Sequence, residues 1–423
     1  PLRVAVIGTG PSASYATRAL LLSTDTEVTI LDRSVLSGGF VRAAVAPDHT
    51  GTKHFASTFD WIHQHPRTRV YMNVTVGKDI THEELLECHD AVIYGVGADQ
   101  DRELGVPGEG LPGVFAAHQL VRWYNADDFA QFEGVTLEAG RAVIVGNGNV
   151  ALDIARILLT DPAELARTEI SAEALEAIRE ASIDEVVILG RRGPCFAAFT
   201  RPELLMMPSG VEVLIASDPL TEAELAEADP GSKAALLSAL ARTNLDLDAA
   251  SSAGRRVVLV FGAHVERFAG ADRVEQAVIS WRGKSIPVAA STVIRSIGQR
   301  GSPIPGLPFD ESTRTVPHRA GRVVDGSAGE AVPGAYVVGW IKRGAHGGIG
   351  VNRADAHETI QSLLSDAGAR ADRPRIKSAR AFKRFVKRKA PFRVSLGAMR
   401  RLERTERLRG SQQGLPRRKW SAE

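Results

Sequence analysis

Two adjacent arginines stand where a buried strand is predicted to end. Residues 186–189 (VVIL) are apolar, Gly190 follows, and then come Arg191 and Arg192. Guanidinium groups at such a place favour an anion, above all a phosphate, which they hold through charge-assisted and often bidentate hydrogen bonds. The plainer alternative is a pair of solvated surface arginines, so the choice depends on the elements around them.

A glycine-rich turn lies upstream of the arginines. Residues 143–159 (VIVGNGNVALDIARILL) read as a strand and then a helix, with Gly146, Gly148 and Ala151 at the three small positions of a dinucleotide-binding loop. The first small residue allows a tight turn, the second lets the backbone approach a pyrophosphate, and the third packs helix on strand. Because arginines follow the next strand, this unit predicts an NADP(H) site in which they bind the 2′-phosphate.

The same arrangement occurs at the start of the chain. Residues 3–21 (RVAVIGTGPSASYATRALL) place Gly8, Gly10 and Ala13 at the three small positions, and the next predicted strand, EVTILD, ends at Asp32. A carboxylate suits the bare 2′-hydroxyl of a ribose, which favours FAD or NAD. Either loop alone could be a simple strand–helix turn. Two in series predict two nucleotide sites on two doubly wound sheets.

A third glycine-rich turn favours a flavin at the first site. The apolar residues 335–338 lead into it, and residues 352–364 (NRADAHETIQSLL) are predicted to form a helix. The positive N-terminal end of a helix would stabilise the anion that collects near N1 and the C2 carbonyl of a reduced flavin. Trp340 is a candidate to lie against the cofactor, although a tryptophan after a strand is also often a core residue.

The composition is that of a two-domain globular protein. The chain has 423 residues, 44% hydrophobic and 24% charged, and no apolar run approaches the ~18 residues of a membrane span. It opens directly into a strand, so no signal peptide is expected within it. The two cysteines, Cys88 and Cys195, lack CxxC or metal-ligand spacing. This predicts reduced thiols, a cytoplasmic location and no metal site.

The last segment is strongly basic. Residues 370–423 contain 19 Lys and Arg but four Asp and Glu, although the net charge of the whole chain is only +2. Phe382, Phe385 and Val386 alternate with bases and could form a basic amphipathic helix. A solvated arm and an electrostatic landing site for an acidic protein are the two main interpretations. Nucleic acid and an anionic membrane surface are less favoured.

Motifs that the sequence lacks narrow the class of flavin enzyme. Disulfide reductases need a CxxC pair, glutamate synthase small subunits carry iron–sulfur cysteines, and Baeyer–Villiger monooxygenases carry FxGxxxHxxxW; the sequence has none of these. Electrons from NADPH are therefore expected to leave the flavin for a separate acceptor. An NADPH-dependent oxidase or reductase that acts directly on an organic substrate or O₂, and a non-catalytic flavin-binding protein, remain alternatives.

A series of segments, in the same order, resembles the adrenodoxin reductase family, which includes bacterial NADPH–ferredoxin reductases. They are VAPDH (45–49), YGVGADQDRELGVPGE (94–109), VRWYNA (121–126), VIVGNGNVALDIARILLTDP (143–162), LGRRGPCFAAFT (189–200), IRSIGQRG (294–301) and YVVGWIKRG (336–344). The segment GLPRRKW (414–420) is similar to a basic stretch that closes many bacterial members.

This resemblance implies an α/β fold with two Rossmann-like domains and a basic C-terminal extension. The FAD domain would be discontinuous (1–102 and 330–369), the NADP domain inserted (103–329), and the extension would cover 370–423. NADPH would reduce FAD, and FAD would pass electrons to an acidic ferredoxin-like iron–sulfur protein that feeds a haem monooxygenase or another redox partner. A monomer is favoured.

The resemblance also assigns site residues. His49, which ends the APDH motif, would lie near the flavin and assist hydride transfer or tune the flavin, and Glu203 would be a second catalytic residue. The residues expected at FAD are Gly8, Gly10, Pro11, Ser12, Ala13, Asp32, Phe40, Val76, Trp340, Gly347, Gly348 and Ile349. Those expected at NADPH are Arg102, Asn147, Gly148, Asn149, Val150, Arg191, Arg192 and Glu203.

Three departures from the family pattern bear on these assignments. In SGGFVRAA (37–44), Ser37 and Ala44 replace a proline and a glycine, so the loop that lines the flavin could sit differently. Met206 replaces a second acid that would help to close the site around the nicotinamide. His346 stands where a small polar residue is usual.

Overall fold

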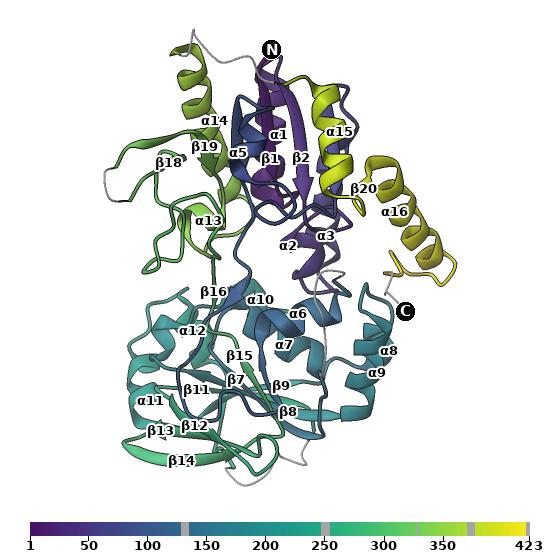
Figure 1. Cartoon of the computed structure of the whole chain (residues 1–423). Helices are drawn as coiled ribbons and strands as arrows, with labels where there is room; N and C mark the ends of the chain where they lie inside the picture. The colour runs from purple at the N-terminus through teal and green to yellow at the C-terminus, as the bar shows by residue number, and fades with distance from the viewer. Residues whose placement is uncertain (128–134, 247–253, 327–328, 370–376, 420–423) are drawn as a thin grey trace.

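Two β-sheets, one wholly and one mainly parallel and each flanked by helices, form the frame of the molecule (Figure 1). The computed structural model describes residues 1–127, 135–246, 254–326, 329–369 and 377–419. The central strands of both sheets are buried and apolar, as expected for strands covered on both faces. The predicted α/β fold with two Rossmann-like units is confirmed.

The first sheet gathers segments from both ends of the chain. Its parallel strands lie in the order β19, β4, β1, β2, β3, and antiparallel strands extend both edges. Helices α1 (Pro11–Ser23) and α14 (Val351–Ala369) pack together and bury their apolar residues against this sheet. The strands are β1 (Arg3–Ile7), β2 (Glu27–Asp32), β3 (Thr68–Met72), β4 (Ala91–Tyr94), β17 (His318–Arg319), β18 (Arg322–Val324), β19 (Ala331–Val337) and β20 (Val394–Ser395).

The second sheet is built from the middle of the chain and is parallel throughout, in the order β10-β9-β11-β8-β7-β15-β6. Helices α6 (Ala117–Tyr124), α7 (Asn149–Leu159) and α9 (Ala172–Ala181) share one apolar core with it. An antiparallel sheet of β12 (His264–Ala269), β13 (Gln276–Trp281) and β14 (Lys284–Ala289) shares a second core with it. The parallel strands are β6 (Val114–Ala116), β7 (Gly140–Val145), β8 (Ile183–Gly190), β9 (Glu212–Ala216), β10 (Ala241–Thr243), β11 (Arg256–Phe261) and β15 (Thr292–Arg295).

The remaining helices are short. They are α2 (Phe40–Ala43), α3 (Thr50–Phe55), α4 (Asp60–Gln64), α5 (His82–Leu86), α8 (Pro162–Leu165), α10 (Arg201–Leu205), α11 (Pro219–Ala226), α12 (Lys233–Ser238) and α13 (Trp340–Arg343), with 3-10 turns at Ala56–Phe59 and Pro194–Phe196. Within the ranges given above, no helix is both long and apolar enough to cross a membrane.

Two crossings of the chain connect the sheets. The outgoing strand β5 (Gln100–Asp101) and the returning strand β16 (Gln299–Arg300) pair antiparallel between the two units. The predicted domain boundaries at 102/103 and 329/330 remain predictions. Sheet membership favours an earlier return than residue 330, because β17 and β18 belong to the first sheet.

The described part of the basic extension is folded onto the first unit. Helix α15 (Ala379–Lys389) buries Phe382 and Val386 in the core below the sheet, which confirms a basic amphipathic helix there. Strand β20 then pairs with the edge strand β3, and α16 (Leu396–Ser411) follows. Because these elements pack on the first unit, the solvated-arm interpretation does not hold for residues 377–419. Residues 370–376 and 420–423 lie outside the described residues.

Glycine is required at the first position of each dinucleotide loop. Gly8 has φ +113°, and a Cβ there would lie 2.5 Å from the carbonyl oxygen of Gly95. Gly146 has φ +106°, and its Cβ would lie 2.2 Å from the carbonyl oxygen of Ser296. Each turn therefore needs a backbone conformation and a close approach that only glycine permits.

We predict that Gly146→Ala lowers the free energy of unfolding by about 1–3 kcal/mol or more, because a strained backbone and a clash coincide. Gly148→Ala is the matched control, since a Cβ at Gly148 meets no heavy atom within 4 Å. Urea denaturation of both variants tests this. Equal stability of the two variants would contradict the account of the turn.

Candidate active site

A cavity of about 690 Å³ opens at the carboxyl ends of the first sheet's parallel strands. Such crevices are where nucleotides bind in doubly wound folds. Of the residues expected at FAD, Ala13 does not line this cavity but packs against Gly95, on which a Cβ would lie only 2.9 Å from the Cβ of Ala13. The other residues expected at FAD all line the cavity: Gly8, Gly10, Pro11, Ser12, Asp32, Phe40, Val76, Trp340, Gly347, Gly348 and Ile349.

Asp32 fixes the first dinucleotide loop as well as facing the cavity. Its Oδ2 accepts hydrogen bonds from the backbone N–H of Thr9 (2.7 Å) and from the Thr9 hydroxyl (2.6 Å), and its Oδ1 accepts one from the N–H of Ser34 (2.8 Å). The carboxylate is thus held at the end of β2 with remaining acceptor capacity toward a ribose. Thr9 occupies a variable position of the glycine motif, so the motif did not mark it as a site residue.

Two aromatic rings close one part of the cavity. Phe40 on α2 and Trp340 on α13 meet edge to face, with ring centroids 4.7 Å apart. Both line the cavity, so Trp340 is not only a core residue. These two rings could pack on the planar rings of a flavin.

The third glycine-rich turn leads into α14, as predicted. Gly347 and Gly348 precede the helix start at Val351, and Asn352 in its first turn also lines the cavity. The Ser12 hydroxyl donates to Oδ1 of Asn352 at 2.8 Å, which ties the helix to the first loop. His346, a departure from the family pattern, is exposed and does not line the cavity.

The second loop adjoins the two arginines, as the pattern required. Helix α7 begins at Asn149, and a Cβ on Gly190, at the end of β8, would lie 2.6 Å from the side-chain amide nitrogen of Asn147. Directly after Gly190, Arg191 and Arg192 are exposed. The Arg192 guanidinium lies over the Phe196 ring at 5.0 Å from its centroid. An accessible pair of guanidinium groups next to a helix N-terminus fits a 2′-phosphate.

The other residues expected at NADPH support the loop or stand beside it. Oδ1 of Asn149 accepts a hydrogen bond from the N–H of Thr200 at 2.7 Å, which holds the segment that follows the arginines. Arg102 is exposed directly after β5, where its backbone N–H donates to the carbonyl oxygen of Gly298 at 3.1 Å. Met206 is 40% exposed at the end of α10.

His49 lies between the two units rather than on the wall of the cavity. Its Nε2 is 2.9 Å from Oδ1 of Asp153 on α7 and 3.3 Å from Oε2 of Glu203 on α10. Val45 and Thr52, four residues before and three residues after His49, line the cavity. The structure therefore brings together His49 and Glu203, the two residues expected to be catalytic, and adds Asp153.

A buried arginine organises this cluster. The Arg156 side chain is 2% exposed; its Nε and Nη2 donate to the two carboxylate oxygens of Asp48 at 2.6 and 3.0 Å, and its Nη2 donates to Asp153 at 2.6 Å. Its Nη1 is 3.6 Å from Glu203. Asp48 belongs to the first unit and Arg156 to the second, so the pair fixes the loop that presents His49.

The carboxylates hold His49 as a cation. Contacts with Asp153 and Glu203 raise the pKa of His49 to about 9, against the opposing effects of burial and of Arg156. The same contact lowers the pKa of Glu203.

His49, Asp153 and Glu203 each place a ligand atom within 4.8 Å of the others, a spacing a metal ion could bridge. Arg156 and the His49 proton already supply positive charge there.

We predict that His49 stabilises the fold in acid more than in base. Its pKa is about 9 when folded and near 6.5 when unfolded, so its stabilisation is complete below about pH 6.5 and is lost as the pH rises through 9. His49→Gln should cost at most about 3 kcal/mol at pH 6 and almost nothing at pH 10. Denaturant titrations at both pH values check this, with the exposed His264→Gln as control. A cost that does not change with pH would refute the ion pair.

The chain is similar to known flavoprotein reductases. The model of the pyridine nucleotide-disulphide oxidoreductase family matches residues 2–199. A probable ferredoxin/ferredoxin–NADP reductase of Mycobacterium tuberculosis is 40% identical over 100% of this chain and 74% of its own. The mitochondrial NADPH:adrenodoxin oxidoreductase of Arabidopsis thaliana is 32% identical over 99% of this chain and 93% of its own.

A solved structure agrees with these sequence matches. Mycobacterium tuberculosis FprA in complex with NADPH has a TM-score of 0.88 and 38% identity, covering 100% of this chain and 98% of that chain. The matches therefore extend over both sheets, both dinucleotide loops and the C-terminal extension. The chain belongs to the adrenodoxin reductase family of NADPH–ferredoxin reductases.

Proposed function

We propose that this chain is an FAD-containing NADPH–ferredoxin reductase, in which NADPH reduces FAD and single electrons then pass to a ferredoxin-like iron–sulfur protein. The observation that carries the proposal is the pair of dinucleotide loops on two sheets, one followed by Asp32 and the other by Arg191 and Arg192. Relatives are named for the same activity.

The residues present fit both nucleotides. FAD, when bound, supplies the exchange between two-electron and one-electron transfer. Asp32 would hold its ribose, the N-terminus of α14 would face its pyrimidine edge, and Phe40 and Trp340 would pack on its rings. Arg191 and Arg192 would bind the 2′-phosphate of NADPH. These residue roles are proposals that the geometry supports.

His49 is proposed to act as a fixed cation beside the flavin. Its proton is held by Asp153 and Glu203, and Asp48 and Arg156 fix the backbone that carries it. A positive charge at this place would favour the extra negative charge of the reduced cofactor. Glu203 would act through His49, so Met206 in place of a second acid leaves this contact intact.

The direct test is anaerobic mixing of the yellow protein with NADPH, followed by addition of a ferredoxin and a haem acceptor. We expect rapid bleaching of the flavin band and electron flow that depends on the ferredoxin. Bleaching followed by equally fast turnover with O₂ or an organic acceptor alone would favour the alternative oxidase or reductase. No bleaching would favour a non-catalytic flavin protein.

We predict that Arg191→Ala/Arg192→Ala raises the KM for NADPH about 10²-fold, because each charge-assisted hydrogen bond is worth ~1.5–3 kcal/mol. NADH lacks the phosphate, so its KM should hardly change. The contact is far from the reacting carbon, so kcat should fall much less than kcat/KM. Steady-state kinetics with both nucleotides at one salt concentration decides. Equal losses with NADH and NADPH would make the arginines structural.

We further propose that the partner is acidic and that the basic extension steers it. The outer faces of α15 and α16 carry exposed bases, whereas Phe382 and Val386 on α15 and Met399 on α16 are buried. An acidic ferredoxin would be attracted to this face and associate faster.

Cys88 and Cys195 are both free, which supports a reducing compartment such as the cytoplasm. A monomer remains our expectation.

We predict that Lys383→Glu/Lys387→Glu on α15 slows reduction of ferredoxin at low salt by roughly tenfold and flattens its salt dependence. Reduction of the flavin by NADPH should be unaffected, because ferredoxin takes no part in it. Arg267→Glu/Lys284→Glu, on exposed positions of β12 and β14 in the second unit, is the control with the same charge change. The same slowing in both variants would mean that net charge matters and the α15 face does not.

A further inference from the structure

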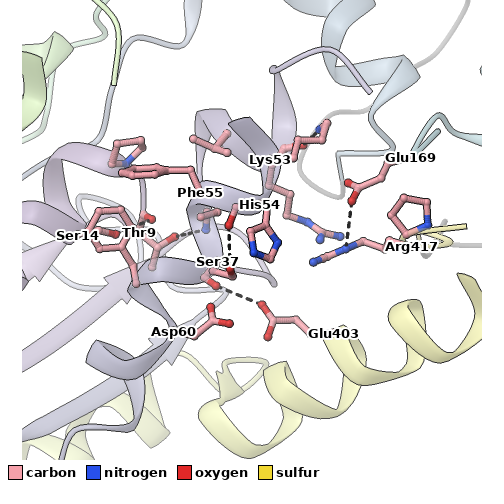
Figure 2. A pocket seen from close by; sticks show the side chains of 18 of the residues that line it. Thr9, Ser14, Ser37, Lys53, His54, Phe55, Asp60, Glu169, Glu403 and Arg417 are labelled. Atoms are coloured by element: carbon pink, nitrogen blue, oxygen red, sulfur yellow. Dashed lines mark hydrogen bonds and ion pairs between the residues drawn. The ribbon is translucent and has the colours of Figure 1, made fainter. Parts of the chain in front are cut away.

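The segment 403–419 at the end of the chain, here called the C-terminal clamp, wraps the loop 37–44. Figure 2 shows Glu403 of the clamp facing Ser37 and Arg417 facing Glu169 at a second cavity of about 600 Å³. Thr9 and Pro11 of the first dinucleotide loop line both this cavity and the flavin cavity, and Ser37 and Gly38 line this one. No role for the clamp follows from the reductase activity itself.

The loop 37–44 touches the first dinucleotide loop directly. Gly39 has φ +49°, and a Cβ there would be 2.7 Å from Cα of Gly10. The N–H of Gly38 donates to the Thr9 hydroxyl at 3.3 Å, and Phe40 packs on Trp340. Any shift of this loop therefore changes the wall of the flavin cavity.

Two carboxylates of the clamp hold the loop at both ends. The Ser37 hydroxyl donates to Glu403 at 3.3 Å, so the serine that replaces the family's proline has a contact with the clamp. Arg42 donates to both oxygens of Glu406, at 3.0 and 2.7 Å, and Arg417 donates to Glu406 at 3.0 Å. The Glu406 residue is 1% exposed. A buried bidentate pair of this kind fixes position and orientation together.

Lys419 joins the loop to the second unit. Its Nζ donates to Oδ1 of Asn125 at 2.6 Å and to the carbonyl of Arg42 at 3.3 Å. Lys53 makes the same two contacts, at 2.8 and 3.4 Å. Asn125, which ends α6, also donates to the carbonyl of Val45 at 3.0 Å. Two lysines thus converge on one amide oxygen where the two units and the clamp meet.

Burial shapes the chemistry of this junction. It lowers the pKa of Lys53 to about 8 and that of Lys419 well below its usual value. Replacing Lys419 by a neutral side chain therefore removes its two hydrogen bonds, to Asn125 and to the carbonyl of Arg42, without leaving a buried charge of opposite sign. Asn125 still accepts its hydrogen bond from Lys53. Glu406→Gln is harsher, because Arg42 and Arg417 lose their shared carboxylate.

We propose that the C-terminal clamp is a positioning element of the reductase. Glu406 and Lys419 hold the loop 37–44, and with it Phe40, in place at the flavin cavity, and Lys419 ties this loop to the second unit through Asn125. Both are positioning residues that act through the loop. The kinetic part of the inference rests on the proposed function, whereas the part about FAD binding does not.

Lys419→Met and Glu406→Gln in the full chain test the clamp. We expect about tenfold weaker binding of FAD by the apoprotein, measured by quenching of FAD fluorescence, and about tenfold slower reduction of the flavin by saturating NADPH. Lys284→Met on β14 and Glu180→Gln on α9, both exposed, make the same chemical changes away from the clamp and should match the wild type.

A lowered Tm with FAD affinity and reduction rate within twofold of the wild type would assign the clamp a merely structural role and overturn the proposal. If Glu406→Gln does not fold, the milder Lys419→Met decides by itself. Failure of the wild type to be reduced by NADPH would instead refute the proposed function, and FAD affinity would still test the clamp.

Discussion

The buried ion pair between Arg156 and Asp48 is the contact on which the arrangement of the two units depends. A guanidinium that is 2% exposed is strongly destabilising unless its charge is matched. Asp153 and Glu203, of the same unit, match part of this charge, but the bidentate carboxylate, Asp48, comes from the other unit, so separating the units would remove two of the hydrogen bonds of Arg156. The pair also fixes the backbone beside His49, whose imidazole reaches back to Asp153. One electrostatic requirement thereby positions both the interface and the proposed catalytic cation.

The molecule contains the same glycine turn in both dinucleotide loops, and the charge of the residues after the next strand distinguishes the two loops. Gly8 and Gly146 make equivalent turns, each pressed against the backbone at the end of another strand. The element after the next strand then sets the chemistry. Asp32 is tied down by Thr9 and suits a ribose hydroxyl, whereas Arg191 and Arg192 are exposed and suit a phosphate. Two similar folds can therefore hold two different nucleotides in fixed order.

Features governed by local pattern were predictable from the sequence. The strands, the two turns, the helix after Gly350 and the cavity position of Asp32 follow from spacing within about 30 residues, and the structure has them. The salt link of His49 to Asp153 was missed because it spans 104 residues and two units. Its only trace was the Asp–Arg pair three residues apart on α7, which reads equally well as an ordinary helix-surface pair.

The basic extension shows the same limit. Its charge suggested an arm or a landing site, and its apolar spacing suggested a helix, but nothing local showed that Lys419 would reach Asn125. Ser37 looked like a departure that weakened the flavin site, whereas the structure gives it a partner in Glu403. Contacts of this kind depend on where the whole chain places its ends, which residue patterns do not encode.

An ion-pair cluster between the units, formed by Asp48, Arg156, Asp153 and Glu203, holds His49 as a cation. The most direct measurement is an NMR pH titration of the His49 imidazole in the flavin-loaded protein, assigned with His49→Gln. We expect His49 to keep its proton through neutral pH and to titrate near pH 9. A midpoint near 6.5, the value of an unperturbed histidine, would contradict it.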